Sequence, residues 1–165
     1  MYDLILLSIF PICLATAAVY DLTTMTIPNW ISGVLVVAFC VLAWPLGVGP
    51  GEFGIHALVG AAALVLGFTL FAFGLFGGGD AKLLAAISLW IGPDFYLHFI
   101  FFTALAGGLL ALAVMIARRF PLPVAWASQD WVARLHTAGS GIPYGVALSA
   151  GGAYAFLQAY ATQAG

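Results

Sequence analysis

The chain has 165 residues, of which 64% are hydrophobic and only 6% are charged, and its formal net charge is -2 at pH 7. Soluble domains carry roughly a quarter charged residues, so this chain has too little polar surface to cover a core in water. The composition therefore excludes an ordinary soluble domain. It predicts an all-α integral membrane protein, because open strands cannot satisfy their backbone in lipid.

The N-terminal segment predicts a retained membrane helix over about residues 4–20. It has no basic residue ahead of its apolar stretch, where a signal peptide would have one, and it carries Asp3 there instead. A bilayer core takes about 20 residues of helix, and this stretch is long enough to span it.

Five further apolar runs, separated by polar residues, glycines and prolines, predict further membrane helices. They cover about residues 30–46, 53–76, 81–91, 95–117 and 144–161. We expect one membrane-embedded domain over 1–165 with a single substantial loop at about 118–143. In this loop, Trp126, Trp131 and Arg134 are typical of a short helix at the membrane interface.

The basic residues orient the predicted bundle. With six spans and the N-terminus outside, every Lys and Arg falls on the cytoplasmic side, as the positive-inside rule expects. These residues are Lys82, Arg118, Arg119 and Arg134. A five-span arrangement, which fuses the fourth and fifth runs, would place Lys82 and the arginines on opposite faces. Orientation therefore favours six spans, with the loop at 118–143 in the cytoplasm.

Two aspartates at the ends of predicted spans are the candidate catalytic residues. Asp21 follows the first span and Asp80 opens the fourth, so both lie at cytoplasmic helix ends. Ionisable residues at membrane depth are costly and suggest function. Two carboxylates close together in low dielectric share a proton, which provides one acid to polarise a peptide carbonyl and one base to activate water. Taken alone, Asp21 is equally typical of a loop residue at a helix boundary, whereas the three glycines before Asp80 make that interpretation less fitting for Asp80.

Helix polarity predicts which aspartate holds the shared proton. Asp80 lies at a helix N-terminus, where the dipole favours an anion, and Lys82 is close in sequence. Asp21 lies at a helix C-terminus, where an anion is disfavoured. This argument predicts Asp80 as the resting base and Asp21 as the protonated acid.

Three short motifs lie around these residues. Ile27-Pro28-Asn29 follows Asp21, and Gly77-Gly78-Gly79-Asp80 is followed by Lys82-Leu83-Leu84. Ile142-Pro143-Tyr144-Gly145 stands at the start of the last predicted helix. These motifs resemble the IPN turn, the GxGDxKLL run and the usual start of the last helix in the type IV prepilin peptidase family of GxGD aspartic membrane proteases. Together with the six-span layout, they cover nearly the whole chain.

The resemblance implies a membrane aspartic endopeptidase with Asp21 and Asp80 as its catalytic residues. Its substrates would be prepilins or pseudopilins, cleaved between a short basic leader and a hydrophobic helix at the cytoplasmic face of the bacterial inner membrane. The supporting motif residues would be Gly77, Gly78, Gly79, Lys82, Pro28 and Asn29. The three glycines allow close approach of a backbone, such as an extended substrate or a packed helix. Lys82 is also typical of a positive-inside anchor. Pro28 and Asn29 are more typical of a turn that leads into the second helix than of a substrate contact.

The long members of that family carry an insertion with paired CxxC motifs, which this sequence does not match. We therefore expect no methyltransferase activity, and the short form is most similar to the branch that serves Flp/Tad-type pili. No cofactor, metal or nucleic-acid partner is expected. The cysteines Cys13 and Cys40 lie in apolar runs, and no His residues have metal-ligand spacing.

Two other functions are alternatives to the protease. A small transporter or channel would bind protons or cations at Asp21 and Asp80. A catalytically silent subunit of a pilus system would need neither aspartate. The joint pattern of the three motifs favours the protease, because transport does not require it.

Overall fold

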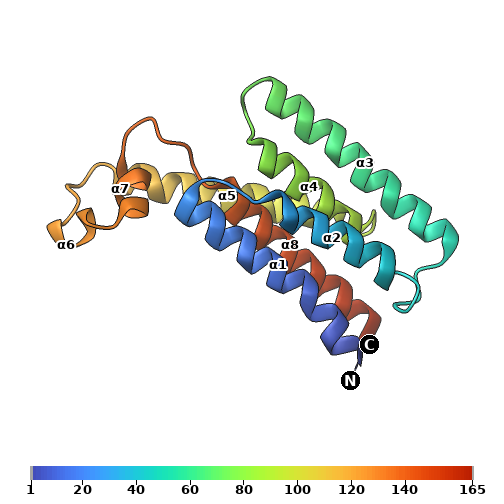
Figure 1. The fold of residues 1–165 in the computed structure, drawn as a ribbon. Coiled ribbons are helices and arrows are strands. Elements are labelled where there is room, and N and C mark those ends of the chain that lie inside the picture. Colours follow the sequence, from blue (N-terminus) through green and yellow to red (C-terminus); the bar gives the residue numbers. More distant parts are fainter. Residues whose placement is uncertain (1, 165) are drawn as a thin grey trace.

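The computed structural model describes the backbone of residues 2–164 and the side chains of residues 8–123, 125–126 and 128–162. Within these residues all regular secondary structure is helical, which confirms the all-α prediction (Figure 1). The helices are α1 (Tyr2–Thr24), α2 (Asn29–Leu42), α3 (Pro50–Ala72), α4 (Gly78–Ile91), α5 (Tyr96–Ala117), α6 (Val124–Ala127), α7 (Asp130–His136) and α8 (Tyr144–Ala164).

Each of the six predicted apolar runs forms one helix, with ends that differ by a few residues from the prediction. α2 stops at Leu42, before Pro45, and α3 stops at Ala72, close to Gly74 with its φ of 72°. α4 begins at Gly78, earlier than expected, and therefore contains Asp80. The reason is a capping arrangement at its N-terminus, which the apolar pattern does not report.

Among the residues whose side chains the structure describes, two helices, α3 and α5, are by length and composition able to cross a membrane. The described part of α1, Ser8–Thr24, and α2 are shorter apolar helices. Large apolar side chains cover the outward faces of α3 and α5, and they include Leu58, Val65, Phe101 and Leu109. A soluble protein rarely exposes so continuous an apolar surface. These faces support a lipid environment, while the arrangement as six spans stays a prediction.

α4 is the central helix of the bundle. It packs against α2, α3, α5 and α8, and its buried residues point in all directions around the helix axis. The helix has only 14 residues, well short of a bilayer core. Because other helices surround it, α4 is covered mainly by protein rather than by lipid, and this permits its short length.

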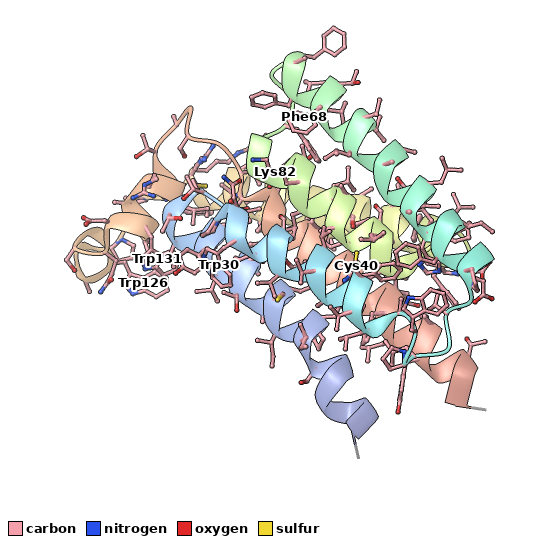
Figure 2. All side chains as sticks on the ribbon, turned by 45° about the vertical axis from the view of Figure 1, so that its right-hand side comes forward. Trp30, Cys40, Phe68, Lys82, Trp126 and Trp131 are labelled. Atoms are coloured by element: carbon pink, nitrogen blue, oxygen red, sulfur yellow. The ribbon has the colours of Figure 1, made fainter. Side chains whose placement is uncertain are left out.

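The helix ends that the topology predicts on one face of the membrane do lie at one end of the bundle. The last turns of α1 and α5 and the first turns of α2, α4 and α8 all point toward the end that carries α6 and α7 (Figure 1). Lys82 and Trp30 lie toward this end, together with Trp126 and Trp131, whereas Cys40 lies toward the other (Figure 2). The short helices α6 and α7 occupy the predicted loop.

Candidate functional site

Asp21 lies inside the last turns of α1 rather than after the helix, and its side chain is buried. One carboxylate oxygen, Oδ2, accepts a hydrogen bond of 2.6 Å from the backbone N–H of Gly145, in the first turn of α8. The backbone N–H of Val146 also donates a hydrogen bond to this carboxylate. The N-terminus of α8, which has unpaired N–H groups and a positive dipole end, therefore points at Asp21.

Gly145 has to be a glycine for this contact to form. A Cβ atom at this position would lie 2.8 Å from Asp21 Oδ2 and 2.6 Å from Ile27 Cδ1. Both distances are too short for real contacts, and Asp21 Cβ would lie only 3.0 Å away, so a larger residue would displace the Asp21 and Ile27 side chains or push α8 away from α1. Gly145 is therefore a site residue, whereas its motif in the sequence indicates only the start of the last helix.

Asp80 is the third residue of α4, and its carboxylate caps the start of that helix. Its Oδ2 accepts a hydrogen bond of 3.2 Å from the backbone N–H of Gly77, the N-cap residue. The other oxygen, Oδ1, is buried and has no hydrogen-bond partner among the described residues. A buried polar atom without a partner is costly, and such atoms in native structures are often functional.

The three sequence motifs meet around one side chain, Ile27. A Cβ atom at Gly79 would lie 3.1 Å from Ile27 Cβ, and one at Gly145 would lie 2.6 Å from Ile27 Cδ1. The charge of Asp21 also acts on the Asp80 carboxyl through space. The structure therefore brings together the two aspartates, so that the protonation of one depends on the charge of the other.

The glycine run before Asp80 has two constrained positions and one free one. A Cβ atom at Gly77 would lie 2.9 Å from Asp80 Oδ2, and one at Gly79 would press against Ile27. A Cβ atom at Gly78 would meet only the ring of Phe71, at an ordinary 3.7 Å. The first and third glycines are thus explained by contacts within the chain, and the second tolerates a side chain.

Lys82 and Asn29 connect the second motif to the first. Lys82 Nζ donates a hydrogen bond of 2.8 Å to Asn29 Oδ1. Asn29 is the first residue of α2, and Pro28 precedes it as the N-cap residue in an extended conformation. Lys82 therefore ties the start of α2 to the start of α4, close to Asp80.

His56 lies outside this site. His56 Nδ1 contacts the carbonyl oxygen of Leu89 at 2.8 Å, near the opposite end of α4. Among the side chains that the structure describes, no group of three or more His, Cys, Asp or Glu residues is placed to hold a metal ion.

A comparison with family models matches residues 8–112 to the type IV leader peptidase family. The match covers well over half of the chain and includes Asp21, the IPN turn and Asp80. The third motif, at Ile142–Gly145, lies beyond the matched residues, and the structure brings it to Asp21. Searches of curated proteins and of solved structures gave no match. The chain belongs to the type IV leader peptidase family, a family of membrane-embedded proteases of the aspartic type.

Proposed function

We propose that this protein is a membrane aspartic endopeptidase that removes the short basic leader of prepilins or pseudopilins, with Asp21 and Asp80 as its catalytic pair. The observation that carries the proposal is the placement of two interacting carboxylates at one end of the bundle, one of them with a buried, unpartnered oxygen among the described residues. The match to a leader peptidase family supports the substrate class.

The hydrogen bonds favour a division of roles opposite to the one that helix polarity predicts. Asp21 accepts backbone N–H groups from the N-terminus of α8, which stabilise its charged form. Asp80 Oδ1 has no donor among the described residues, so a proton fits best on this oxygen. In the proposal, Asp21 is the base and Asp80 is the acid.

The reaction then proceeds by general acid–base catalysis. Asp21 takes a proton from a water molecule, whose oxygen attacks the carbonyl carbon of the scissile peptide bond. Asp80 donates its proton to the carbonyl oxygen, which gives a neutral tetrahedral diol. The proton on Asp21 passes to the leaving nitrogen as the C–N bond breaks, and Asp80 recovers a proton from the diol as the carboxylic acid forms.

The side of cleavage is proposed from the charges. Lys82, Arg118 and Arg134 belong to the starts or ends of helices at the same end of the bundle as the aspartates. The positive-inside rule makes this end cytoplasmic, in the bacterial inner membrane and with six spans. The short form, without a CxxC insertion, suits a prepilin of the Flp/Tad type. Because the scissile bond borders a hydrophobic helix, the substrate enters between helices from the plane of the membrane.

Leader cleavage of a co-expressed Flp-type prepilin tests the proposal. Asp21→Asn and Asp80→Asn should each lower the cleavage rate by about 100-fold or more, because each removes one partner of the acid–base pair. Asp130→Asn is the matched control, since this exposed aspartate lies in α7 at the same end of the bundle.

Cleavage is followed by gel mobility, and the amount of each variant in the membrane fraction is measured in parallel. Cleavage that persists in Asp21→Asn or Asp80→Asn would remove that residue from the chemistry. Failure of the wild type to process the prepilin would reject this substrate class.

A further inference from the structure

We infer that Arg118 is a positioning residue for the catalytic pair, an inference that rests on the proposed function. Arg118 is the C-cap residue of α5, and its half-buried side chain reaches the segment that leads into α8. Among the described residues, it makes no hydrogen bond with either aspartate. It binds the backbone of Ser140 and Gly141, and this segment leads to Gly145, whose N–H binds Asp21.

One guanidinium group holds two parts of the loop between α5 and α8. Its Nε donates a hydrogen bond of 2.8 Å to the carbonyl oxygen of Leu135, in the last turn of α7. Its Nη2 lies 2.8 Å from Ser140 Oγ, 3.0 Å from Ser140 O and 3.3 Å from Gly141 O. The planar, forked arrangement of guanidinium donors suits such a set of acceptors, and a lysine could not reproduce it.

The Ser140 hydroxyl both accepts and donates a hydrogen bond. It donates its own hydrogen to the carbonyl oxygen of Thr137 at 2.8 Å, so it has only lone pairs left for Arg118. Arg118 therefore fastens the end of α7 and the Ser140–Gly141 segment to the end of α5 through one connected network.

The segment from Gly141 to Gly145 is short and stiff. Only Ile142, Pro143 and Tyr144 separate the two glycines. The buried Pro143 has a fixed φ and restricts Ile142 to an extended conformation, so little freedom remains between the Arg118 contacts and Gly145. A shift at Ser140–Gly141 is therefore passed on to the N–H that binds Asp21.

The same segment also reaches the Asp80 side of the site. The ring of Tyr144 packs against the ring of Phe76, with centroids 5.6 Å apart, and Phe76 directly precedes the glycine run. Loss of the Arg118 contacts would thus disturb the supports of both aspartates. We expect it to lower the rate of the chemical step without changing the residues that meet the substrate.

Arg119 provides the matched control. It carries the same charge at the next position, it is exposed, and its side chain makes no hydrogen bond to the described part of the chain. If the arginine pair served only to keep this end of the bundle in the cytoplasm, replacing either residue would have the same effect.

The test compares Arg118→Gln, Arg118→Lys, Ser140→Ala and Arg119→Gln with the wild type in lipid nanodiscs, using a Flp-type prepilin as substrate. We expect Arg118→Gln to lower kcat about tenfold and to leave KM within about twofold, because a charge-assisted network is lost but no substrate contact is. Arg118→Lys should restore little of the loss. Ser140→Ala, which keeps the backbone contacts of Arg118, should fall between wild type and Arg118→Gln. Arg119→Gln should behave as the wild type.

A second readout follows the Gly145 amide by NMR in protein labelled with 15N-glycine, with Asp21→Asn used to identify its signal. The signal should move in Arg118→Gln and stay in place in Arg119→Gln. Equal kinetic losses in the two glutamine variants, or an unmoved Gly145 signal in Arg118→Gln, would overturn the inference. If even the wild type cleaves no prepilin, the proposed function fails, while the Gly145 signal still decides whether Arg118 positions the segment.

Discussion

The carboxylate of Asp21 accepts a hydrogen bond of 2.6 Å from the backbone N–H of Gly145, a residue 124 positions away in the sequence. The bond joins the end of the first helix to the start of the last one. Because α1 and α8 also pack along each other, the position of this carboxylate depends on how closely they approach. The family match ends before α8, and the contact between the third motif and Asp21 emerges only from the structure.

Gly145→Ala is predicted to reduce both stability and leader cleavage. The added Cβ would lie 2.8 Å from Asp21 Oδ2, and such overpacking typically costs about 1–3 kcal/mol. Gly108→Ala in α5 is the control, since a Cβ there meets nothing within 4 Å. In a helix this exchange is on its own favourable by about 0.5–1 kcal/mol, so the control should be neutral or stabilising. Thermal unfolding in detergent and the cleavage rate are measured for both, and equal behaviour of the two variants would contradict the prediction.

Replacing each of the three glycines before Asp80 by alanine should change the cleavage rate to different extents. Gly78→Ala is predicted to keep cleavage close to the wild-type rate, because its Cβ would meet only Phe71 at 3.7 Å. Gly79→Ala should lose activity, because its Cβ would lie 3.1 Å from Ile27 Cβ and 3.2 Å from Ile27 O. Gly77→Ala should also lose activity through the contact with Asp80 Oδ2. Prepilin cleavage by the three variants gives the answer, and a uniform loss would indicate instead that the substrate backbone approaches all three glycines.

The six apolar helices were predictable because in lipid a helix must satisfy its own backbone, so apolar length alone locates it. Their ends were less predictable, since they depend on local contacts. The Gly77 N–H bond to Asp80 starts α4 earlier than the apolar pattern suggests, and α1 continues past Asp21. The order of the spans also allowed the two aspartates to be paired, because helix ends on one side of a bundle can meet.

The sequence could not predict which groups donate hydrogen bonds to the aspartates, and the reason is physical. Helix polarity considered only the helix that carries each aspartate, whereas the donors at Asp21 come from α8. The role of Arg118 has no sequence signature, because most of its acceptors are backbone carbonyl groups, which every residue has. From the sequence, Arg118 and Arg119 are equivalent.

Lys82 and Asn29 should show measurable coupling in a double-mutant cycle. Lys82→Met and Asn29→Ala each remove one partner of a 2.8 Å hydrogen bond to a charged group, which is worth about 1.5–3 kcal/mol at most and less when exposed. The double variant should therefore lose less stability than the sum of the two single variants. Unfolding midpoints of the four proteins provide the cycle. If Lys82→Met abolishes cleavage while Asn29→Ala does not, Lys82 contacts the substrate rather than serving only as this tie.

His56→Phe is predicted to lower stability without lowering the cleavage rate of the folded protein. The carbonyl oxygen of Leu89 cannot receive the usual helical hydrogen bond, because residue 93 is a proline without an N–H. His56 Nδ1 supplies the missing donor at 2.8 Å, and since a carbonyl oxygen only accepts, this nitrogen carries the hydrogen.

Phenylalanine keeps an aromatic ring against Phe39, where the ring centroids are now 5.5 Å apart, and removes the donor. Leaving this carbonyl oxygen unpaired should cost about 1–3 kcal/mol, or several degrees in the unfolding midpoint. His98→Phe is the control, since this exposed histidine makes no hydrogen bond to the described residues. Because His56 contacts the opposite end of α4 from Asp80, kcat should be unchanged. A fall in kcat with an unchanged midpoint would show that the end of α4 far from the aspartates communicates with them.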